Sequence, residues 1–277
     1  MAQNIYDNLT FFENYSLLKR SIEGLSGAPE WPRLRSFLPP LQDTHILDLG
    51  CGMGWYAPYF SAQGASSVRG IDLSQNMLAR ARSMNAASNI TYVLGDLDSP
   101  SSQPVLLPDS DTGNIDVVFS ALAVHYLTHL PELVAHIHRV LKPGGVFIFS
   151  AEHPILTAPS GPGPVEIDAS DHPGDAGRTR KTVWPLNDYQ KEGERVTDWL
   201  ADGVKKYHRT TASYVNILLK AGFELTGFDE WYPTEEEFEE KPEWREEMKS
   251  EMMKPTFLLV RARKKENQNR EGLRRLG

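Results

Sequence analysis

The sequence predicts an α/β fold in which helices cover both faces of a mostly parallel sheet. Short apolar runs alternate with amphipathic stretches over residues 45–151, the pattern of repeated strand–helix units. One run, Ile115–Ser120, is apolar almost throughout, as expected for a strand buried on both faces. We therefore expect a doubly wound sheet that binds its ligands at the carboxyl ends of the strands.

The first predicted strand ends in an acid and three alternate glycines, within the segment His45–Gly54. Glycine adopts positive φ without steric cost, and the helix start that follows leaves free backbone N–H groups beside a ligand. A dinucleotide site requires G-x-G-x-x-G, but here the spacing is Gly50-x-Gly52-x-Gly54 and Trp55 stands in place of the third glycine. The carboxylate of Asp48 would repel a pyrophosphate and suits a cationic ligand.

A second predicted strand, Ser67–Asp72, ends in a carboxylate about twenty residues beyond the loop, where related nucleotide-binding folds hold a ribose. A carboxylate can accept hydrogen bonds from both hydroxyls of one ribose. Asp72 could instead cap the helix expected over 74–86, but Ser74 is the better N-cap. We therefore assign Asp72 to ribose binding.

Further strands are expected at Ile90–Leu94 and Val146–Ser150, with a loop over 99–112 and a helix over 131–141. The helix is expected to stop at Pro143–Gly145. Because ligands bind where strands end, Ser120, at the end of the predicted strand Ile115–Ser120, is expected near the ligand. His125 and Tyr126, which follow it, are expected there too.

The stretch LDLGCGMG at residues 47–54 resembles motif I of the class I S-adenosylmethionine (SAM)-dependent methyltransferases. LKPGG at 141–145 is similar to a second sequence motif of that family. The resemblance covers about residues 44–151. It implies a Rossmann-like, seven-stranded, mostly parallel sheet with a C-terminal antiparallel hairpin, SAM as cofactor and S-adenosylhomocysteine (SAH) as product. It also implies adenine contacts from Asp96 and Leu97. The expected cofactor-binding residues are Asp48, Gly50, Cys51, Gly52, Gly54, Asp72, Leu73, Asp96, Leu97 and Ser120.

Residues 152–209 depart from the alternation and predict an insertion that covers the acceptor site. Its prolines and glycines indicate long loops, whereas its aromatic residues indicate packing instead of disorder. We expect a short hairpin from Val196–Leu200 and Val204–Tyr207. The residues expected to contact the acceptor, each with a purely structural role as the alternative, are Tyr6, Tyr15, Tyr126, Glu152, Trp184 and Tyr207.

Both ends of the chain are expected outside the repeated units. Residues 1–43 predict a helical arm with helical spacing over 5–24, and its aromatic residues either pack against the domain or form a lid over the cofactor. The methyltransferase domain is expected at 44–263 and a disordered basic tail at 264–277. Within the domain, a helix over 211–221, strands over 223–231 and 256–263, and an acidic helical stretch over 233–254 close the chain.

Composition excludes several classes of function. The net charge of −8 argues against general nucleic-acid affinity. The absence of a long apolar run and of a signal-peptide pattern predicts a cytoplasmic protein without a membrane partner. The single cysteine, Cys51, allows no disulfide framework and is expected to be a small buried thiol. His136 and His138 would face different directions on a helix, so no metal site is expected. The oligomeric state stays open.

These features predict methyl transfer from SAM to an O, N or C atom of a small-molecule acceptor. The enzyme's main task would be alignment of the acceptor behind the methyl group. A hydroxyl or carbon acid would also need a base, for which His125 is the first candidate, followed by His153 and His208. The alternatives are a cyclase or isomerase on the same fold and a non-catalytic SAM-binding partner subunit. Trp55 and Asp48 disfavour an NAD-dependent reductase.

Overall fold

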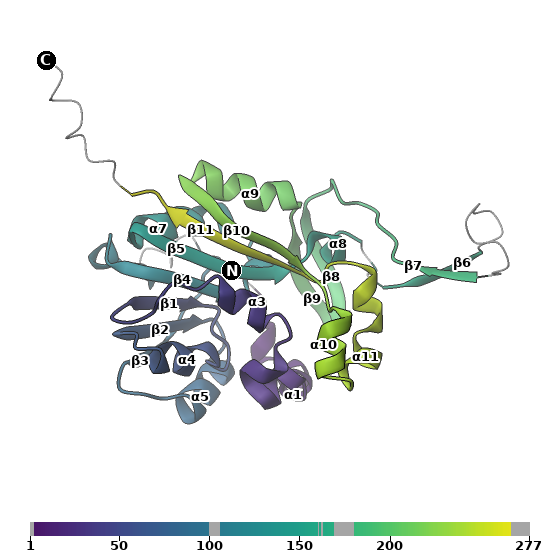
Figure 1. Cartoon of the computed structure of the whole chain (residues 1–277), viewed down its shortest axis with the longest axis horizontal. Coiled ribbons are helices and arrows are strands. Elements are labelled where there is room, and N and C mark those ends of the chain that lie inside the picture. The colour runs from purple at the N-terminus through teal and green to yellow at the C-terminus, as the bar shows by residue number, and fades with distance from the viewer. Residues whose placement is uncertain (1–2, 100–105, 160, 162, 169–179, 267–277) are drawn as a thin grey trace, which may run out of the picture.

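A computed structural model describes residues 3–99, 106–159, 161, 163–168 and 180–266, and a seven-stranded sheet forms its centre (Figure 1). The strand order is β10-β11-β5-β4-β1-β2-β3, and β11 runs antiparallel to both of its neighbours. The predicted fold class and the closing hairpin β10–β11 are confirmed. The strands are β1 (His45–Leu49), β2 (Ser67–Asp72), β3 (Ile90–Leu94), β4 (Ile115–Ala121), β5 (Leu141–Glu152), β10 (Phe223–Trp231) and β11 (Phe257–Lys264).

Alternate residues of the central strands pack into two cores, one on each face of the sheet. In β1, Leu47 and Leu49 enter one core and Ile46 enters the other, and Val118 and Val117 of β4 divide in the same way. Burial on both faces leaves the strand ends as the place where a ligand can reach the sheet. The first core is covered by α7 (Leu130–Val140) and α9 (Thr211–Lys220), and the second by α3 (Trp31–Ser36) and α4 (Tyr56–Ala62).

Helix ends largely follow the predicted signals. Ser74 caps α5 (Gln75–Met84), and its Oγ accepts a hydrogen bond from the Met77 N–H at 3.1 Å. After α7 the next strand begins at Leu141 and not at Val146 as predicted, because Leu141 is fully buried and pairs with Ile115. Two short helical turns, η3 (Asp109–Asp111) and η4 (Val124–Tyr126), flank β4.

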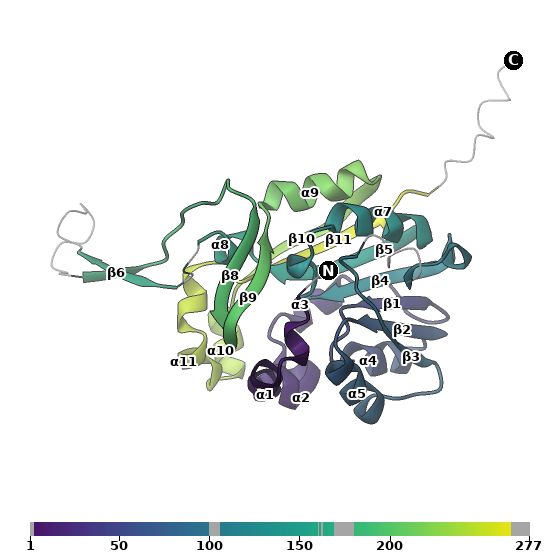
Figure 2. The ribbon, with the colours of Figure 1, turned by 180° about the vertical axis from the view of Figure 1, so that it is seen from behind.

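The N-terminal segment and the insertion are joined to each other. The side chain of Gln3 accepts from the Lys205 N–H at 2.8 Å and donates to the Gly203 carbonyl at 2.9 Å. The β8–β9 hairpin confirms the hairpin predicted there, and the β6–β7 ribbon extends from the body (Figures 1 and 2). The elements are η1 (Ile5–Asp7), α1 (Leu9–Ser16), α2 (Lys19–Glu23) and η2 (Gly24–Gly27), then α8 (Pro154–Thr157), β6 (Val165–Asp168), β7 (Arg180–Val183), β8 (Gly193–Trp199) and β9 (Ala201–His208).

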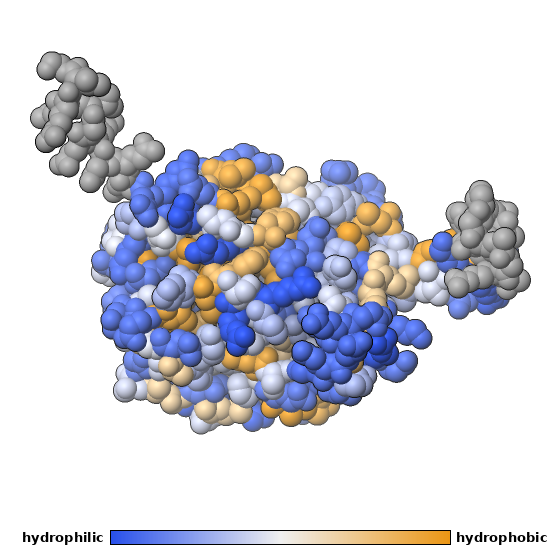
Figure 3. Space-filling view, in the orientation of Figure 1, coloured by the Kyte–Doolittle hydropathy of each residue, from blue (hydrophilic) through white to orange (hydrophobic). Residues whose placement is uncertain are grey.

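The acidic stretch between β10 and β11 is helical, as predicted. It forms α10 (Glu235–Glu240), α11 (Trp244–Glu247) and η5 (Lys249–Met253). Thr234 and Glu237 form a reciprocal capping box at the start of α10. Hydrophilic residues gather where α10 and α11 lie (Figure 3), so this stretch presents a solvated face. Of the predicted disordered tail, Lys264 belongs to β11 and residues 267–277 lie outside the described residues.

Candidate active site

A cavity of about 240 Å³ lies at the carboxyl ends of β1, β2 and β4, where an open α/β sheet binds its ligands. Backbone of the glycine loop and side chains that follow β2 and β3 line one part of it, and aromatic side chains line another. Of the predicted cofactor residues, those that line the cavity are Gly50, Cys51, Gly52, Asp72, Leu73, Asp96 and Leu97, whereas Asp48, Gly54 and Ser120 do not.

The glycine loop depends on positive φ, which is +72° at Gly50 and +53° at Gly52. A Cβ added to Gly50 would collide with the Cβ of Ala123, but one added to Gly52 would meet no atom within 4 Å and would stand in the cavity. The Gly50 N–H donates to the Ile71 carbonyl and the Gly52 N–H donates to Asp72 Oδ2, both at 2.8 Å. These two hydrogen bonds hold the loop against β2.

Both carboxylate oxygens of Asp72 accept backbone hydrogen bonds. Oδ2 accepts from Gly52 at 2.8 Å and Oδ1 accepts from Ser74 at 2.9 Å. Burial raises the pKa of Asp72, although the amides of Ser74 and Gly52 act in the opposite direction. Each oxygen keeps a second acceptor site, so Asp72 can take hydrogen bonds from two neighbouring hydroxyls in the cavity.

The carboxyl group of Asp48, immediately before the loop, is buried, and neither oxygen has a hydrogen-bond partner among the described residues. Burial, followed by the nearby Asp72, raises the pKa of Asp48 to about 8. A buried carboxyl without a partner is costly, and a cation beside the loop would favour its ionised form. Ser120 Oγ donates to the Leu49 carbonyl at 2.8 Å, which joins β4 to β1 in place of the predicted ligand contact.

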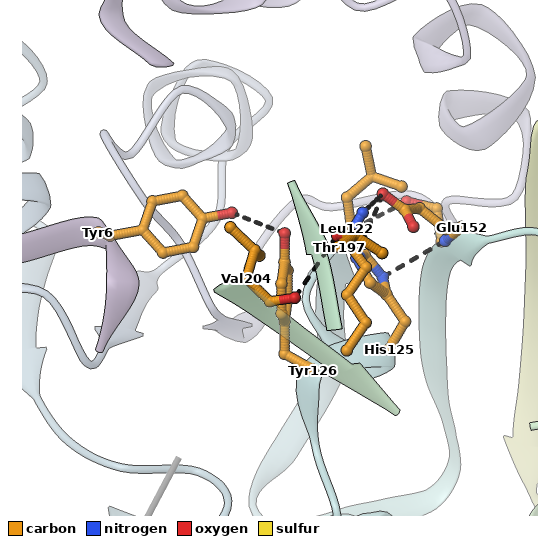
Figure 4. A network of polar contacts seen from close by, with 9 residues as sticks. Tyr6, Leu122, His125, Tyr126, Glu152, Thr197 and Val204 are labelled. Carbon is orange, nitrogen blue, oxygen red and sulfur yellow. Dashed lines mark hydrogen bonds and ion pairs between the residues drawn. The ribbon is translucent and has the colours of Figure 1, made fainter. Parts of the chain in front are cut away.

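An aromatic wall, which we define as Tyr6, Tyr15, Tyr126 and Trp199, lines the cavity and comes from three separate parts of the chain. Tyr6 packs edge-on against Tyr15 and Tyr126, with ring centroids 5.2 and 6.1 Å apart. The hydroxyls of Tyr6 and Tyr126 are 3.3 Å apart (Figure 4). The predicted acceptor residues Tyr6, Tyr15 and Tyr126 are thus brought together.

His125 lies beside Glu152 at the end of β5 (Figure 4). The backbone N–H of Glu152 donates to His125 Nδ1 at 3.3 Å, which places the imidazole proton on Nε2. Burial lowers the pKa of His125 to about 4, so the ring is neutral at pH 7. The predicted role of His125 as a base is therefore not supported, because one nitrogen accepts a hydrogen bond and the other carries the proton.

The Glu152 side chain lines the cavity and is held from one side. Its Oε1 accepts from Lys206 Nζ at 2.6 Å and lies 3.9 Å from His125 Nε2. Lys206 also lies over the ring of Trp199, with Nζ 4.8 Å from the ring centroid. Burial acts to raise the pKa of Glu152, but His125 and Lys206 outweigh it and hold that pKa below its ordinary value. The carboxylate is therefore ionised at neutral pH.

The other two predicted histidines do not line the cavity. His153 Nε2 lies 2.9 Å from Glu230 Oε1, and its Nδ1 accepts the Ile155 N–H at the start of α8. His208 bonds Thr157 Oγ1 at 2.8 Å and the Tyr189 carbonyl at 2.9 Å. His153 thus ties β10 to the residue that follows β5, and His208 joins parts of the insertion to one another, so neither imidazole is placed to contact an acceptor.

Two predicted acceptor residues of the insertion also lie away from the cavity. Trp184 packs beneath Lys254, whose Nζ is 4.3 Å from its ring centroid, and Tyr207 packs beneath the guanidinium of Arg209 at 4.2 Å. Neither ring lines the cavity, so the predicted acceptor contacts are not found.

Arg20, Tyr56 and Phe257 line the cavity and were not predicted as site residues. Phe257 begins β11 and pairs with Glu152, the last residue of β5. An antiparallel strand starts at the edge where its parallel neighbours end, which could have identified Phe257. Arg20 is paired with the fully buried Glu30 through two contacts of 3.1 Å, and no local pattern indicates that pairing.

Known proteins resemble this chain over nearly its whole length. The methyltransferase-domain family matches residues 47–149. An uncharacterized protein of Haemophilus influenzae is 32% identical over 264 residues, which covers 95% of this chain and 98% of that protein. The crystal structure of an S-adenosylmethionine-dependent methyltransferase from Mesorhizobium loti is 42% identical, covers 87% of this chain and 100% of its own, and superposes with a TM-score of 0.74.

A named enzyme matches over a shorter stretch. A malonyl-[acyl-carrier protein] O-methyltransferase of Pectobacterium atrosepticum is 35% identical over 118 residues, so the match spans less than half of each protein, 43% of this chain and 42% of the enzyme. Among the described residues, none of the helices has the length and apolar character needed to cross a membrane. The glycine loop, the sheet order and the long matches agree that this chain belongs to the family of SAM-dependent methyltransferases.

Proposed function

We propose that this protein transfers a methyl group from SAM to a small-molecule acceptor in the cavity, with SAH as the second product. SAM supplies an electrophilic methyl group on a positively charged sulfur. The observation that carries the proposal is that one cavity is lined by both the glycine loop and the aromatic wall. A cofactor at the loop and an acceptor at the wall would therefore share one cavity, where alignment can accelerate the transfer.

The residues around the loop fit SAM. Asp72 would accept hydrogen bonds from the ribose hydroxyls, and Asp96 with Leu97 would flank the adenine. The open space beside Gly52 leaves room for the methionine part of the cofactor. The partnerless carboxyl of Asp48 would compensate the positive charge of that part.

The N-terminal arm, residues 1–43, serves as the lid in this proposal, and the insertion 152–209 covers the acceptor through its β8–β9 hairpin, which supplies Trp199. The Asp7 carboxylate accepts from Ser74 Oγ at 2.6 Å and from the Asn76 N–H at 3.1 Å, which ties η1 to the start of α5 beside Asp72. The arm supplies Tyr6 and Tyr15 to the aromatic wall. An enclosed wall of this kind suits a small molecule better than a polymer.

Calorimetric titration with SAM, SAH and NADPH tests the cofactor, with Asp72→Ala beside the wild type. We expect SAM and SAH to bind, NADPH not to bind, and Asp72→Ala to weaken SAH binding at least about tenfold, because a hydrogen bond to a charged group contributes about 1.5–3 kcal/mol. Glu132→Gln, an exposed carboxylate on α7, is the matched control and should bind as wild type. A protein that binds no SAM, or that converts an acceptor without consuming SAM, would contradict the proposal.

A further inference from the structure

Glu152 has an oxygen that the fold leaves free inside the cavity. Its Oε1 is occupied by Lys206, but Oε2 has no hydrogen-bond partner among the described residues. The side chain is only 13% exposed and lines the same cavity as the aromatic wall. A half-satisfied buried carboxylate gains from a donor on a bound molecule. The acceptor is therefore expected to bring an N–H or O–H group to Oε2.

The groups beside Glu152 do not suit a hydroxyl acceptor. Methylation of a hydroxyl needs a base whose pKa lies near the working pH. His125 offers no lone pair, because Nδ1 accepts the Glu152 N–H and Nε2 carries the proton. Glu152 itself is a weak base, since Lys206 and His125 keep its pKa below the ordinary value.

A carboxylate acceptor finds no counter-charge that is free to bind it. Among the described lining residues the cation is Arg20, and both of its terminal nitrogens are engaged by Glu30 at 3.1 Å. A carboxylate near the aromatic wall would instead meet Glu152, which carries the same charge. Like charges at close range in a buried site are unfavourable.

We infer that the acceptor is an amine whose nitrogen donates a hydrogen bond to Glu152 Oε2 while its carbon skeleton packs on the aromatic wall. This inference rests on the proposed function and names the acceptor class of the same site. Ring faces and a carboxylate together stabilise a nitrogen that gains positive charge. Lys206 holds Oε1, and His125 accepts the Glu152 N–H. Both are positioning residues, because they act on the acceptor only through Glu152.

The transfer is balanced without a strong base. The amine, which binds as an ammonium at pH 7, first loses one proton to water. The lone pair of the neutral amine then forms the new N–C bond, and the electron pair of the breaking C–S bond returns to sulfur, which becomes neutral. The nitrogen acquires the positive charge that sulfur loses. The hydrogen bond from N–H to Glu152 strengthens as that charge develops, so the carboxylate stabilises the transition state more than the neutral reactant. The surplus proton leaves to water after the transfer.

Three probes that share one carbon skeleton test this inference: phenethylamine, 2-phenylethanol and 3-phenylpropanoate. Each is titrated into the SAH-saturated protein at pH 7. We expect phenethylamine to bind at least tenfold more tightly than the other two, because only its charge and donors match Glu152. Glu152→Gln should remove this preference and keep wild-type SAH affinity, whereas Glu152→Asp, which keeps the charge, should retain most of it. Glu194→Gln, which alters an exposed ion pair with Lys205, is the matched control and should bind as wild type.

Equal or tighter binding of the alcohol or the carboxylate by the wild type would overturn the inference, as would a failure of phenethylamine to bind at millimolar concentration. An amine preference that persists in folded Glu152→Gln would exclude Glu152 as its source. The wild-type comparison stands even if Glu152→Gln fails to fold, which its SAH affinity and melting temperature would reveal. A protein that does not bind SAH would contradict the proposed function instead.

Discussion

The cofactor side and the acceptor side of the cavity are built in different ways. The cofactor side comes from the turns after successive strands of one sheet, namely the glycine loop, Asp72 and Asp96. The acceptor side joins residues far apart in sequence, such as Tyr6, Tyr126 and Trp199. A site made from consecutive turns follows from local pattern, whereas a site made from distant segments exists only after they dock.

The two sides also differ in charge. On the cofactor side, the carboxyl of Asp48 has no hydrogen-bond partner and Asp72 receives only backbone amides. On the acceptor side, the charges occur as internal pairs, with Arg20 on Glu30 and Lys206 on Glu152. The first arrangement suits a cationic ligand, and the second leaves a nearly neutral pocket with one free carboxylate oxygen. Variants of the glycine loop, of His125 and of Asp7 test this contrast.

Substitutions at two glycines of the loop should separate its role in folding from its role in ligand binding. Gly50→Ala should destabilise the protein by about 2–5 kcal/mol, because positive φ strains alanine and its Cβ overlaps Ala123. Gly52→Ala should cost only the strain, about 1–2 kcal/mol, yet abolish SAH binding because its Cβ enters the cavity. Urea denaturation and SAH titration of both variants measure the two effects. Equal loss of stability in both variants would refute the distinction.

Burial of neutral His125 should make stability depend on pH. The folded-state pKa of about 4 lies below the ordinary value of 6.5, so the unfolded state binds more protons between them. Stability should therefore fall by about 2–3 kcal/mol as the pH decreases from 6.5 to 4.5. Urea denaturation across this range, compared with His125→Asn, isolates the contribution, because the variant lacks the titrating ring.

His45→Asn is the control for this comparison. The His45 side chain is exposed, so this variant should keep the wild-type dependence of stability on pH. An unchanged slope in His125→Asn would mean that His125 is not held neutral. The range stops at pH 4.5 so that protonation of Glu152 does not contribute to the slope. The pKa of Glu152 is lowered in the folded protein, so the stability it adds is lost only as the pH falls below its ordinary value of 4.5.

The smallest effect is expected at the contact between the N-terminal arm and α5. Burial acts to raise the pKa of Asp7, but hydrogen bonds from Ser74, Asn76, Asn4 and Gln75 outweigh burial and lower that pKa. The contact therefore persists above the ordinary pKa of 3.8 and is lost as the pH falls below that value. Asp7→Asn should weaken it by about 1 kcal/mol and speed SAH release about fivefold.

Stopped-flow tryptophan fluorescence can follow this release, since Trp55 lines the cavity. Glu13→Gln, on an exposed position of α1, should release SAH at the wild-type rate. Identical release from Asp7→Asn and wild type would show that the arm does not retain the cofactor.

Much of the cofactor side was predictable because its signals are short-range. Alternating glycines, an acid at the end of β2 and Ser74 as a helix cap each act within a few residues. The same reasoning failed for Ser120, whose hydroxyl bonds Leu49 on the neighbouring strand.

Local sequence pattern was enough to predict the fold class and the position of the cofactor loop, because hydrophobic period and turn chemistry act over a few residues. The docking of distant segments determined which histidine lines the cavity and whether its imidazole ring is charged. His125, His153 and His208 look alike in sequence, but of the three only His125 lines the cavity, where burial keeps its ring neutral. The pairing of Lys206 with Glu152 spans 54 residues and depends on how the insertion docks, which no local pattern encodes.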